Sequence, residues 1–179
     1  MRGGPHNDVW STPSWLFDPL HARLRFDLDC AADARNAKCR RFFDEQANAL
    51  AQCWDARCWW ANVPYGRQPG TGEWVGYARH QVEQLGNQGC LLIPVKAETE
   101  WYQDLVWGRN DVIASRKILD GPIRGRWYRL REPGMLVELL ELRARVSFGD
   151  GSGNGWFASA LVLYNAPRAR GRGLLDFST

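Results

Sequence analysis

The sequence contains no apolar segment approaching the roughly 20 residues that a membrane-spanning helix requires. The polar residues that follow Met1 also lack the apolar core of a secretory signal. A hydrophobic content of 45% separates the chain from disordered proteins. From these observations we expect neither a membrane-spanning protein nor a secreted precursor nor a disordered chain.

Paired cysteines are also lacking, because the chain has five cysteines and no Cys-x-x-Cys motif. The five are Cys30, Cys39, Cys53, Cys58 and Cys90. This distribution is typical of neither a disulfide framework nor a zinc site, so it favours the reducing cytoplasm and predicts no metal centre. The three histidines, His6, His21 and His80, are expected at the surface rather than in catalysis.

A chain of 179 residues is long enough for one core and too short for two comfortable domains. We therefore predict a single domain over residues 1–179. Ten tryptophans exceed average usage and would fill much of that core. Residues 1–9 are expected to be a loose arm, and residues 166–179 a basic tail.

Basic residues are concentrated in the second half of the chain. Residues 1–95 carry ten basic and ten acidic side chains, whereas residues 96–179 carry thirteen and ten. Between positions 116 and 131, six basic residues are opposed only by Asp120. They are Arg116, Lys117, Arg124, Arg126, Arg129 and Arg131. Such a cluster attracts phosphate backbones, and the alternative is a solvated face with a few ion pairs.

The first part of the chain predicts a helix and then a strand. Ser11-Thr12-Pro13 reads as a helix start, and an apolar stripe at helical spacing follows at Trp15, Leu16, Leu20 and Leu24. Residues 26–32 alternate between apolar and polar side chains and then have small side chains. This pattern is typical of a strand that ends where a ligand comes close. Residues 33–48 are polar and show no strong period, and we expect few regular elements over residues 33–57.

The middle of the chain predicts a strand, a helix and a second strand. Residues 58–61 are a short apolar run, a helix is expected from Glu73 to about Leu85, and residues 89–95 read as a buried strand. This order implies a parallel sheet. Residues 99–106 predict a short helix. Residues 144–148 and 158–164 predict two strands joined by a glycine-rich turn, hence an antiparallel hairpin at one edge.

Asn62-Val63-Pro64-Tyr65 follows the strand at 58–61, where open α/β sheets place their ligands. Methylation of an exocyclic amino group needs acceptors for its two N–H bonds, and the Asn62 amide oxygen and the Val63 carbonyl could supply them. Pro64 would hold the loop extended, and Tyr65 would offer a ring for stacking a planar base, worth about 1–3 kcal/mol. A proline turn capped by a buried tyrosine is the alternative.

With four further blocks, this motif makes the chain resemble the phage-type DNA N6-adenine methyltransferases, from Trp10 to Val106 and again from Leu142 to Tyr164. The blocks are Trp10-Ser11-Thr12-Pro13; residues 26–32 with Asn36, Lys38 and Cys39; Asn48-Ala49-Leu50 with Trp54; and Pro94 with Thr99, Trp101 and Tyr102. The resemblance implies an abbreviated α/β fold of the class I, Rossmann-like methyltransferase type, with a mostly parallel sheet and an antiparallel edge hairpin. It also implies S-adenosylmethionine as the cofactor.

By this resemblance, a larger set of residues would contact the cofactor: Trp10, Ser11, Thr12, Pro13, Asp29, Ala31, Ala32, Asn36, Asn48 and Leu50. The physics agrees in part, because the Asp29 carboxylate can accept from the cofactor's ammonium group and two alanines leave room for a ligand. For Asp29, capping of the following turn is an equal alternative. The tetrapeptide Asn62 to Tyr65 would be catalytic.

Three features depart from the family pattern. Val63 stands where proline is usual, which costs loop rigidity but keeps the carbonyl acceptor. Asn48 replaces an aspartate, which keeps an acceptor oxygen and loses the charge. Residues 112–138 form an arginine-rich insert, which is the candidate DNA-reading element.

The sequence thus predicts methyl transfer to adenine N6 in double-stranded DNA, with the target base flipped out of the duplex. We expect the protein in the cytoplasm of a bacterial host, encoded by a phage or prophage. One alternative is a methyltransferase acting on RNA adenine or on a protein amide. The other is an inactive DNA-binding relative.

Overall fold

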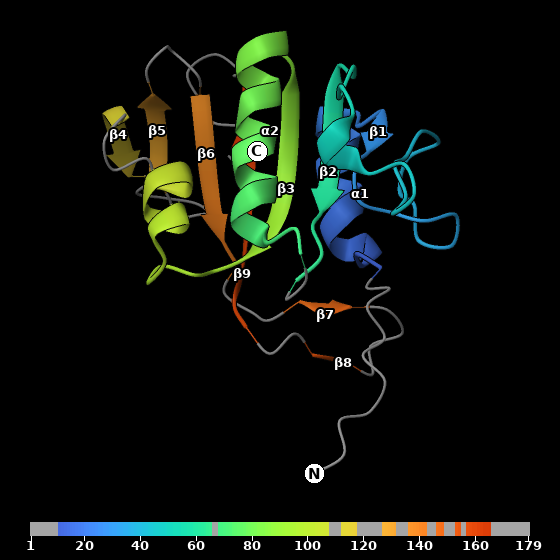
Figure 1. Cartoon of the computed structure of the whole chain (residues 1–179). Helices are drawn as coiled ribbons and strands as arrows, with labels where there is room; N and C mark the ends of the chain where they lie inside the picture. Colours follow the sequence, from blue (N-terminus) through green and yellow to red (C-terminus); the bar gives the residue numbers. More distant parts are fainter. Residues whose placement is uncertain are drawn as a thin grey trace.

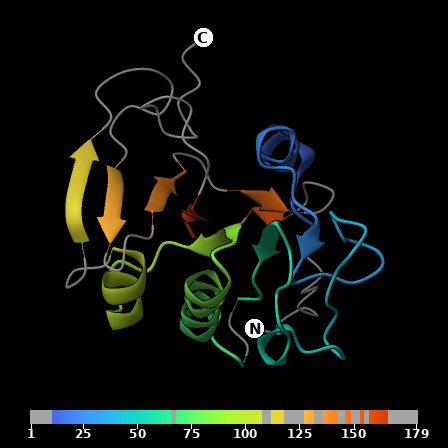
Figure 2. The same ribbon diagram turned by 90° about the horizontal axis from the view of Figure 1, so that it is seen from above.

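The computed structural model describes residues 11–65, 68–107, 112–117, 127–131, 136–142, 146–148, 153–154 and 157–165. Within these ranges the chain forms one seven-stranded sheet, a separate two-stranded sheet, and helices on both faces of the larger sheet. Figure 2 shows α1 on one face and α2 on the other. The fold is therefore α/β, as predicted.

The helical elements are α1 (Ser14–Leu24), η1 (Ala49–Ala51), α2 (Thr71–Leu85) and η2 (Tyr102–Val106). The strands are β1 (Leu28–Asp29), β2 (Cys58–Asn62), β3 (Gln88–Pro94), β4 (Val112–Lys117), β5 (Trp127–Arg131), β6 (Leu136–Glu141), β7 (Ser147–Phe148), β8 (Gly153–Asn154) and β9 (Ser159–Tyr164). None of the helices in the described ranges is long and apolar enough to cross a membrane.

The larger sheet has the strand order β1-β2-β3-β9-β6-β5-β4. Strands β1, β2 and β3 pair in parallel, which confirms the prediction made from the strand, helix, strand pattern. The other four neighbouring pairs are antiparallel. Five strands point in one direction and only β9 and β5 oppose them, so the sheet is mostly parallel in direction but mixed in pairing.

The predicted edge hairpin is wrong in its residues. β9 lies inside the sheet between β3 and β6, and β7 pairs with β8 in the separate small sheet. All six residues of β9 are buried, so this strand needs a neighbour on each side to pair its backbone. The hairpin that does occupy an edge is β4–β5, within the arginine-rich stretch (Figure 1).

The helices match the predicted ones closely. α1 buries Leu16, Leu20 and Leu24 together with Phe17, but Trp15 is 59% exposed, so the stripe predicted from residue 15 is wrong there. Helix α2 ends before Gly86, whose φ of 64° is the left-handed conformation that glycine adopts without strain. Between positions 33 and 57 the only elements are η1 and an isolated bridge, as expected.

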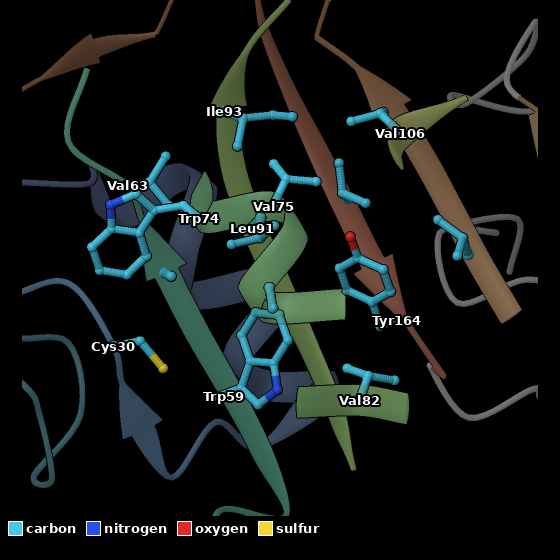
Figure 3. Close-up of a cluster of buried hydrophobic side chains, with 14 of the residues drawn as sticks. Cys30, Trp59, Val63, Trp74, Val75, Val82, Leu91, Ile93, Val106 and Tyr164 are labelled. Carbon is cyan, nitrogen blue, oxygen red and sulfur yellow. The ribbon is translucent and has the colours of Figure 1, made fainter. Parts of the chain in front are cut away.

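Tryptophan dominates both sides of the sheet. Trp54 and Trp59 lie fully buried beneath α2, whereas Trp60 faces the opposite side and packs against α1 through Phe17. Figure 3 shows the α2-side cluster, in which Trp59 of β2 and Trp74 of α2 are labelled. The prediction that tryptophans fill the core is confirmed for these residues. All five cysteines are free thiols.

Gly89 in β3 leaves room for the indole of Trp59. A Cβ at position 89 would overlap Cε2 and Cδ2 of that ring, and the ring is fully buried and has no space to move. We therefore expect Gly89→Ala to lower the free energy of unfolding by about 3 kcal/mol in a urea titration. Gly76→Ala is the matched control, because its Cβ would lie 3.7 Å from Leu105 and alanine favours a helix interior. Equal losses in the two variants would contradict this reason.

Candidate functional site

The candidate site lies where β1 and β2 end side by side. Asp29 is the last residue of β1 and pairs with Trp60, and Asn62 ends β2 two residues further on. The Cys30 N–H donates to the Trp60 carbonyl at 2.8 Å, which extends the pairing beyond β1. Both polar residues therefore lie at the carboxyl edge of the parallel strands, the lower edge in Figure 1.

Asp29 is buried, with 2% of its surface exposed. Its carboxylate accepts the Ala31 N–H at 3.2 Å and the Lys38 N–H at 2.9 Å, so it caps the turn that follows β1. No basic side chain of the described residues forms an ion pair with it. Burial raises the pKa of Asp29 to about 6, and the two backbone hydrogen bonds and the charge of Lys38 only partly oppose that rise. The result is a buried carboxylate whose charge is incompletely balanced.

The turn after Asp29 is fixed by a neighbouring segment. The Asp29 N–H donates to the Arg41 carbonyl, and the Phe43 N–H donates to the Asp29 carbonyl, both at 2.9 Å. Ala31 and Ala32 are half-buried, and Ala31 packs against the α2-side cluster. Asn36 accepts the Asp33 N–H through Oδ1 at 2.7 Å, so its amide also holds the turn.

The segment before α1 approaches the same region. Thr12 is buried, Ser11 and Pro13 are half-buried, and the Pro13 carbonyl accepts the N–H groups that open α1. The Lys38 ammonium lies 5.9 Å from the centre of the Phe17 ring in α1, which connects that helix to the turn that Asp29 caps. Trp10 lies outside the described residues.

The Asn48-Ala49-Leu50 block forms the start of η1. Asn48 is exposed and has a φ of 52°, and asparagine tolerates this left-handed conformation better than most residues. The asparagine that departs from the family pattern thus has a backbone reason. The buried Trp54 anchors the block, because its Nε1–H donates to the Ala49 carbonyl at 2.8 Å. Leu50 packs against the same cluster as Ala31.

The loop after β2 has a buried residue and a half-buried pair. Val63 is 1% exposed and belongs to the cluster that contains Trp74 (Figure 3), so this aliphatic residue serves the core. Pro64 is half-buried. The Tyr65 hydroxyl lies 3.2 Å from Asn62 Oδ1 and 3.3 Å from the Leu92 carbonyl oxygen, and its burial raises the pKa of Tyr65 above its usual value.

Two aromatic contacts of this loop are absent from the sequence prediction. The Tyr65 ring meets Phe157 at 4.8 Å with an interplanar angle of 85°, and it meets Phe148 at 6.3 Å. Phe148 ends β7, and Figure 1 shows the small β7–β8 sheet below the edge where β2 ends. The available signal was a pair of phenylalanines flanking the glycine-rich segment.

The block from Pro94 to Tyr102 packs under α2. Tyr102 is fully buried, and its hydroxyl lies 3.3 Å from Glu141 Oε1. The side chain of Trp101 lies so close to Gly72 that a Cβ there would come within 2.8 Å of Trp101 Cγ. Pro94 ends β3 opposite Ser159. Trp101 therefore packs against the start of the helix that follows the Asn62–Tyr65 loop.

Four residues of the basic cluster lie in the two strands at the edge opposite β1. Arg116 and Lys117 are in β4, and Arg129 and Arg131 are in β5. The register pairs Arg116 with Tyr128. Arg124, Arg126 and the tail at 166–179 lie outside the described residues.

The histidines differ in their exposure. His80 is exposed, as expected, whereas His21 is half-buried because its ring stacks on Phe17 at 5.2 Å. His6 lies outside the described residues. Within the described ranges no group of three or more His, Cys, Asp or Glu side chains could hold a metal ion.

The parallel β1-β2-β3 unit places the chain in the class of open-sheet α/β proteins, a class that commonly binds ligands at the carboxyl edge of its parallel strands. Sequence comparison identifies the family within this class. A model of the DNA N-6-adenine-methyltransferase (Dam) family matches residues 3–128, so the chain belongs to this family.

Two phage proteins are similar to the chain. It is 31% identical over 123 residues to a DNA N-6-adenine-methyltransferase of Escherichia phage T1, covering 68% of this chain and 50% of the relative. It is 28% identical over 111 residues to a protein of the same description from Haemophilus phage HP1 (strain HP1c1), covering 59% of this chain and 61% of the relative. The chain thus spans between half and three fifths of these relatives.

Proposed function

We propose that the protein transfers a methyl group from S-adenosylmethionine to N6 of adenine in double-stranded DNA. The observation that carries the proposal is the placement of Asn62 and Asp29 at the ends of adjacent parallel strands, with Tyr65 hydrogen-bonded to Asn62. Family membership supports the same reaction. We further infer that the sheet is an abbreviated class I methyltransferase fold, on the basis of its parallel β1-β2-β3 unit beside the antiparallel β9.

The residues present fit the cofactor. The Asp29 carboxylate is buried, lacks an ion-pair partner among the described residues, and would be stabilised by an ammonium group. The adjoining Ala31 and Ala32 have the smallest side chains that still carry a Cβ. Trp74 adds a buried donor, because its Nε1–H has no hydrogen-bond partner in the described part of the chain. We infer that the remaining cofactor residues are Trp10, Ser11, Thr12, Pro13, Asn36, Asn48 and Leu50.

Bound S-adenosylmethionine would supply an electrophilic methyl group; its sulfur would keep the electron pair of the broken S–C bond as S-adenosylhomocysteine leaves, and the methylated nitrogen would give up one proton. The chain's own residues then prepare the target nitrogen. Asn62 Oδ1 accepts a hydrogen bond from one N–H of the amino group, and the Val63 carbonyl accepts a hydrogen bond from the other. These bonds draw the nitrogen lone pair out of conjugation with the ring. Pro64 holds the loop, and Tyr65 stacks the base.

The target nitrogen is paired inside a duplex, so the base must be flipped into the site at a cost of a few kcal/mol. We propose that the basic residues of the 112–138 insert supply DNA-binding energy. They are Arg116, Lys117, Arg124, Arg126, Arg129 and Arg131. Because the two relatives are phage proteins, we place the activity in the cytoplasm of a bacterial host.

A transfer assay tests this function. The purified chain is incubated with tritiated S-adenosylmethionine and duplex DNA, and label is expected in DNA that contains adenine but not in poly(dG)·poly(dC). Single-stranded RNA and total protein are parallel substrates. Label in RNA or protein instead of DNA would overturn the proposal in favour of another substrate class.

The Asp29 carboxylate should make cofactor binding depend on pH. Its charged form attracts the ammonium group, so affinity should be constant well above pH 6 and fall about tenfold per pH unit below it. Asp29→Asn should weaken binding at pH 8 by about 1.5–3 kcal/mol and remove this dependence, as measured by calorimetry.

The control is the stability of the cofactor-free protein, which should depend on pH in the opposite direction from cofactor affinity. The folded state holds the Asp29 proton more tightly than the unfolded state, so the free energy of unfolding should fall as pH rises from about 4 to about 6. Asp29→Asn should flatten that slope. If the variant binds cofactor normally and only melts earlier, Asp29 is a turn cap alone.

A further inference from the structure

The Tyr65 hydroxyl lies between two oxygen atoms of neighbouring strands. It is 3.2 Å from Asn62 Oδ1, at the end of β2, and 3.3 Å from the Leu92 carbonyl oxygen in β3. Asn62 and Leu92 are themselves register partners, so the hydroxyl bridges the last pair of the β2–β3 ladder. A phenol has one proton to donate, and both neighbours are acceptors.

The ring that carries this hydroxyl is held by aromatic contacts. Phe157 approaches it nearly perpendicularly, at 4.8 Å and 85°, and Phe148 approaches at 6.3 Å and 66°. Phe148 is itself buried in the cluster on the α1 side of the sheet. A hydroxyl on a ring held in this way loses little further freedom when it forms a hydrogen bond, so it can fix the group to which it donates.

Asn62 is a group whose orientation matters. Its amide presents an oxygen at one end and an NH₂ group at the other, and only the oxygen can accept an N–H bond. Rotation of the amide by 180° would present a donor to the target amino group and remove the acceptor. A hydrogen-bond donor beside the amide therefore decides which end is available.

We propose that the Tyr65 hydroxyl is a positioning group, which donates to Asn62 Oδ1 and keeps the oxygen end of that amide beside the Tyr65 ring. This inference rests on the proposed function, because its purpose is to present the acceptor to a base stacked on that ring. The Leu92 carbonyl is the competing acceptor, because the hydroxyl can donate its one proton to only one of the two oxygens at a time. In the rotated amide, Nδ2 would donate to the hydroxyl, which would turn to Leu92, and the experiment distinguishes the two arrangements.

A double-mutant cycle at positions 62 and 65 tests the proposal in single-turnover transfer at saturating DNA and cofactor. Tyr65→Phe keeps the ring and removes the hydroxyl, and it should slow transfer about tenfold while both dissociation constants change less than twofold. In the Asn62→Asp background the same change should cost less than about twofold, because either oxygen of a carboxylate is an acceptor. Tyr77→Phe is the matched control: its hydroxyl donates to the Gln52 carbonyl at 2.8 Å, and the rate should not change.

Two rate outcomes would overturn the inference. Equal losses in the two backgrounds would mean that the hydroxyl only supports the loop. An unchanged or faster rate for Tyr65→Phe in the asparagine background would mean that the amide is rotated.

A titration supplies a readout that does not depend on methyl transfer. In Asn62→Asp, a hydroxyl that donates to the carboxylate lowers the pKa of the introduced carboxyl, so adding Tyr65→Phe should raise that pKa by about one unit in a carbon-13 NMR titration. An unchanged pKa would overturn the inference even if every variant is inactive. A wild-type chain that methylates no adenine overturns the proposed function instead, so the two failures are distinguishable.

Discussion

Asn62→Ala is expected to slow methyl transfer by at least about 10²–10³-fold, the usual effect of removing one preorganised hydrogen-bonding group from a reaction centre. In the proposed function the amide acts on the target amino group rather than on the methyl donor. The dissociation constant of S-adenosylmethionine should therefore change by no more than a few-fold. Rapid-quench single-turnover assays measure the chemical step, and calorimetry measures cofactor binding.

Gln88→Ala is the matched control for this substitution. Gln88 is a half-buried amide at the opposite end of the neighbouring strand, so its loss tests the general effect of removing an amide from this sheet. The control should transfer methyl groups at the wild-type rate. Weaker cofactor binding by Asn62→Ala together with normal single-turnover transfer would contradict the catalytic role of Asn62.

Neutralising the arginines of the insert together should lower DNA affinity by about 10²–10³-fold at moderate salt and leave cofactor affinity unchanged. The four substitutions are Arg124→Gln, Arg126→Gln, Arg129→Gln and Arg131→Gln. Each lost phosphate contact should reduce the slope of log affinity against log salt by about 0.9, whereas a base-reading arginine should relax one position of the recognition site at a cost of about 1–3 kcal/mol. Fluorescence anisotropy over a range of salt concentrations measures both quantities.

A control variant with the same change in net charge separates local from global electrostatics. It neutralises four exposed basic residues outside the insert: Arg23, Arg25, Arg57 and Lys96. Its DNA affinity and salt slope should change much less than those of the insert variant. Similar losses in the two variants would mean that the insert is a solvated face and that DNA is bound elsewhere.

Local patterns were sufficient to predict the central β2-α2-β3 unit. The apolar run at 58–61 and the continuous apolar strand at 89–95 each specify one element with little help from the rest of the chain. The parallel pairing follows from the helix between the two strands. The same reasoning placed Asn62 at a strand end.

The position of β9 could not be predicted in this way. Its buried sequence was recognised as a strand, but its partners β3 and β6 are chosen by long-range packing rather than by the glycine-rich turn before it. The prediction that Trp15 is part of the buried stripe was wrong for a different reason. A stripe at helical spacing does not specify where the buried face ends, and here Phe17 takes the place beside Leu16 while Trp15 turns outward.

The candidate site likewise combines features that local patterns predict with features that depend on long-range packing. The ends of β1 and β2 bring Asp29 and Asn62 to one edge, as adjacent parallel strands require. The contacts of Tyr65 with Phe148 and Phe157 connect residues more than 80 positions apart, and no local pattern contains that information. Local patterns also do not show that Val63 is buried in the core. This burial gives the departure from the family pattern a packing role.

The most direct measurement is the N6-methyladenine content of DNA from a bacterial strain that lacks adenine methylation and expresses the chain. Nucleoside digestion followed by mass spectrometry quantifies the modified base, and modification-sensitive sequencing locates it. The proposed function predicts N6-methyladenine in cells that express the wild-type chain, and none above background in cells that express Asn62→Ala at the same level. Equal amounts in the two strains, or none in either despite cofactor binding by the purified chain, would contradict it.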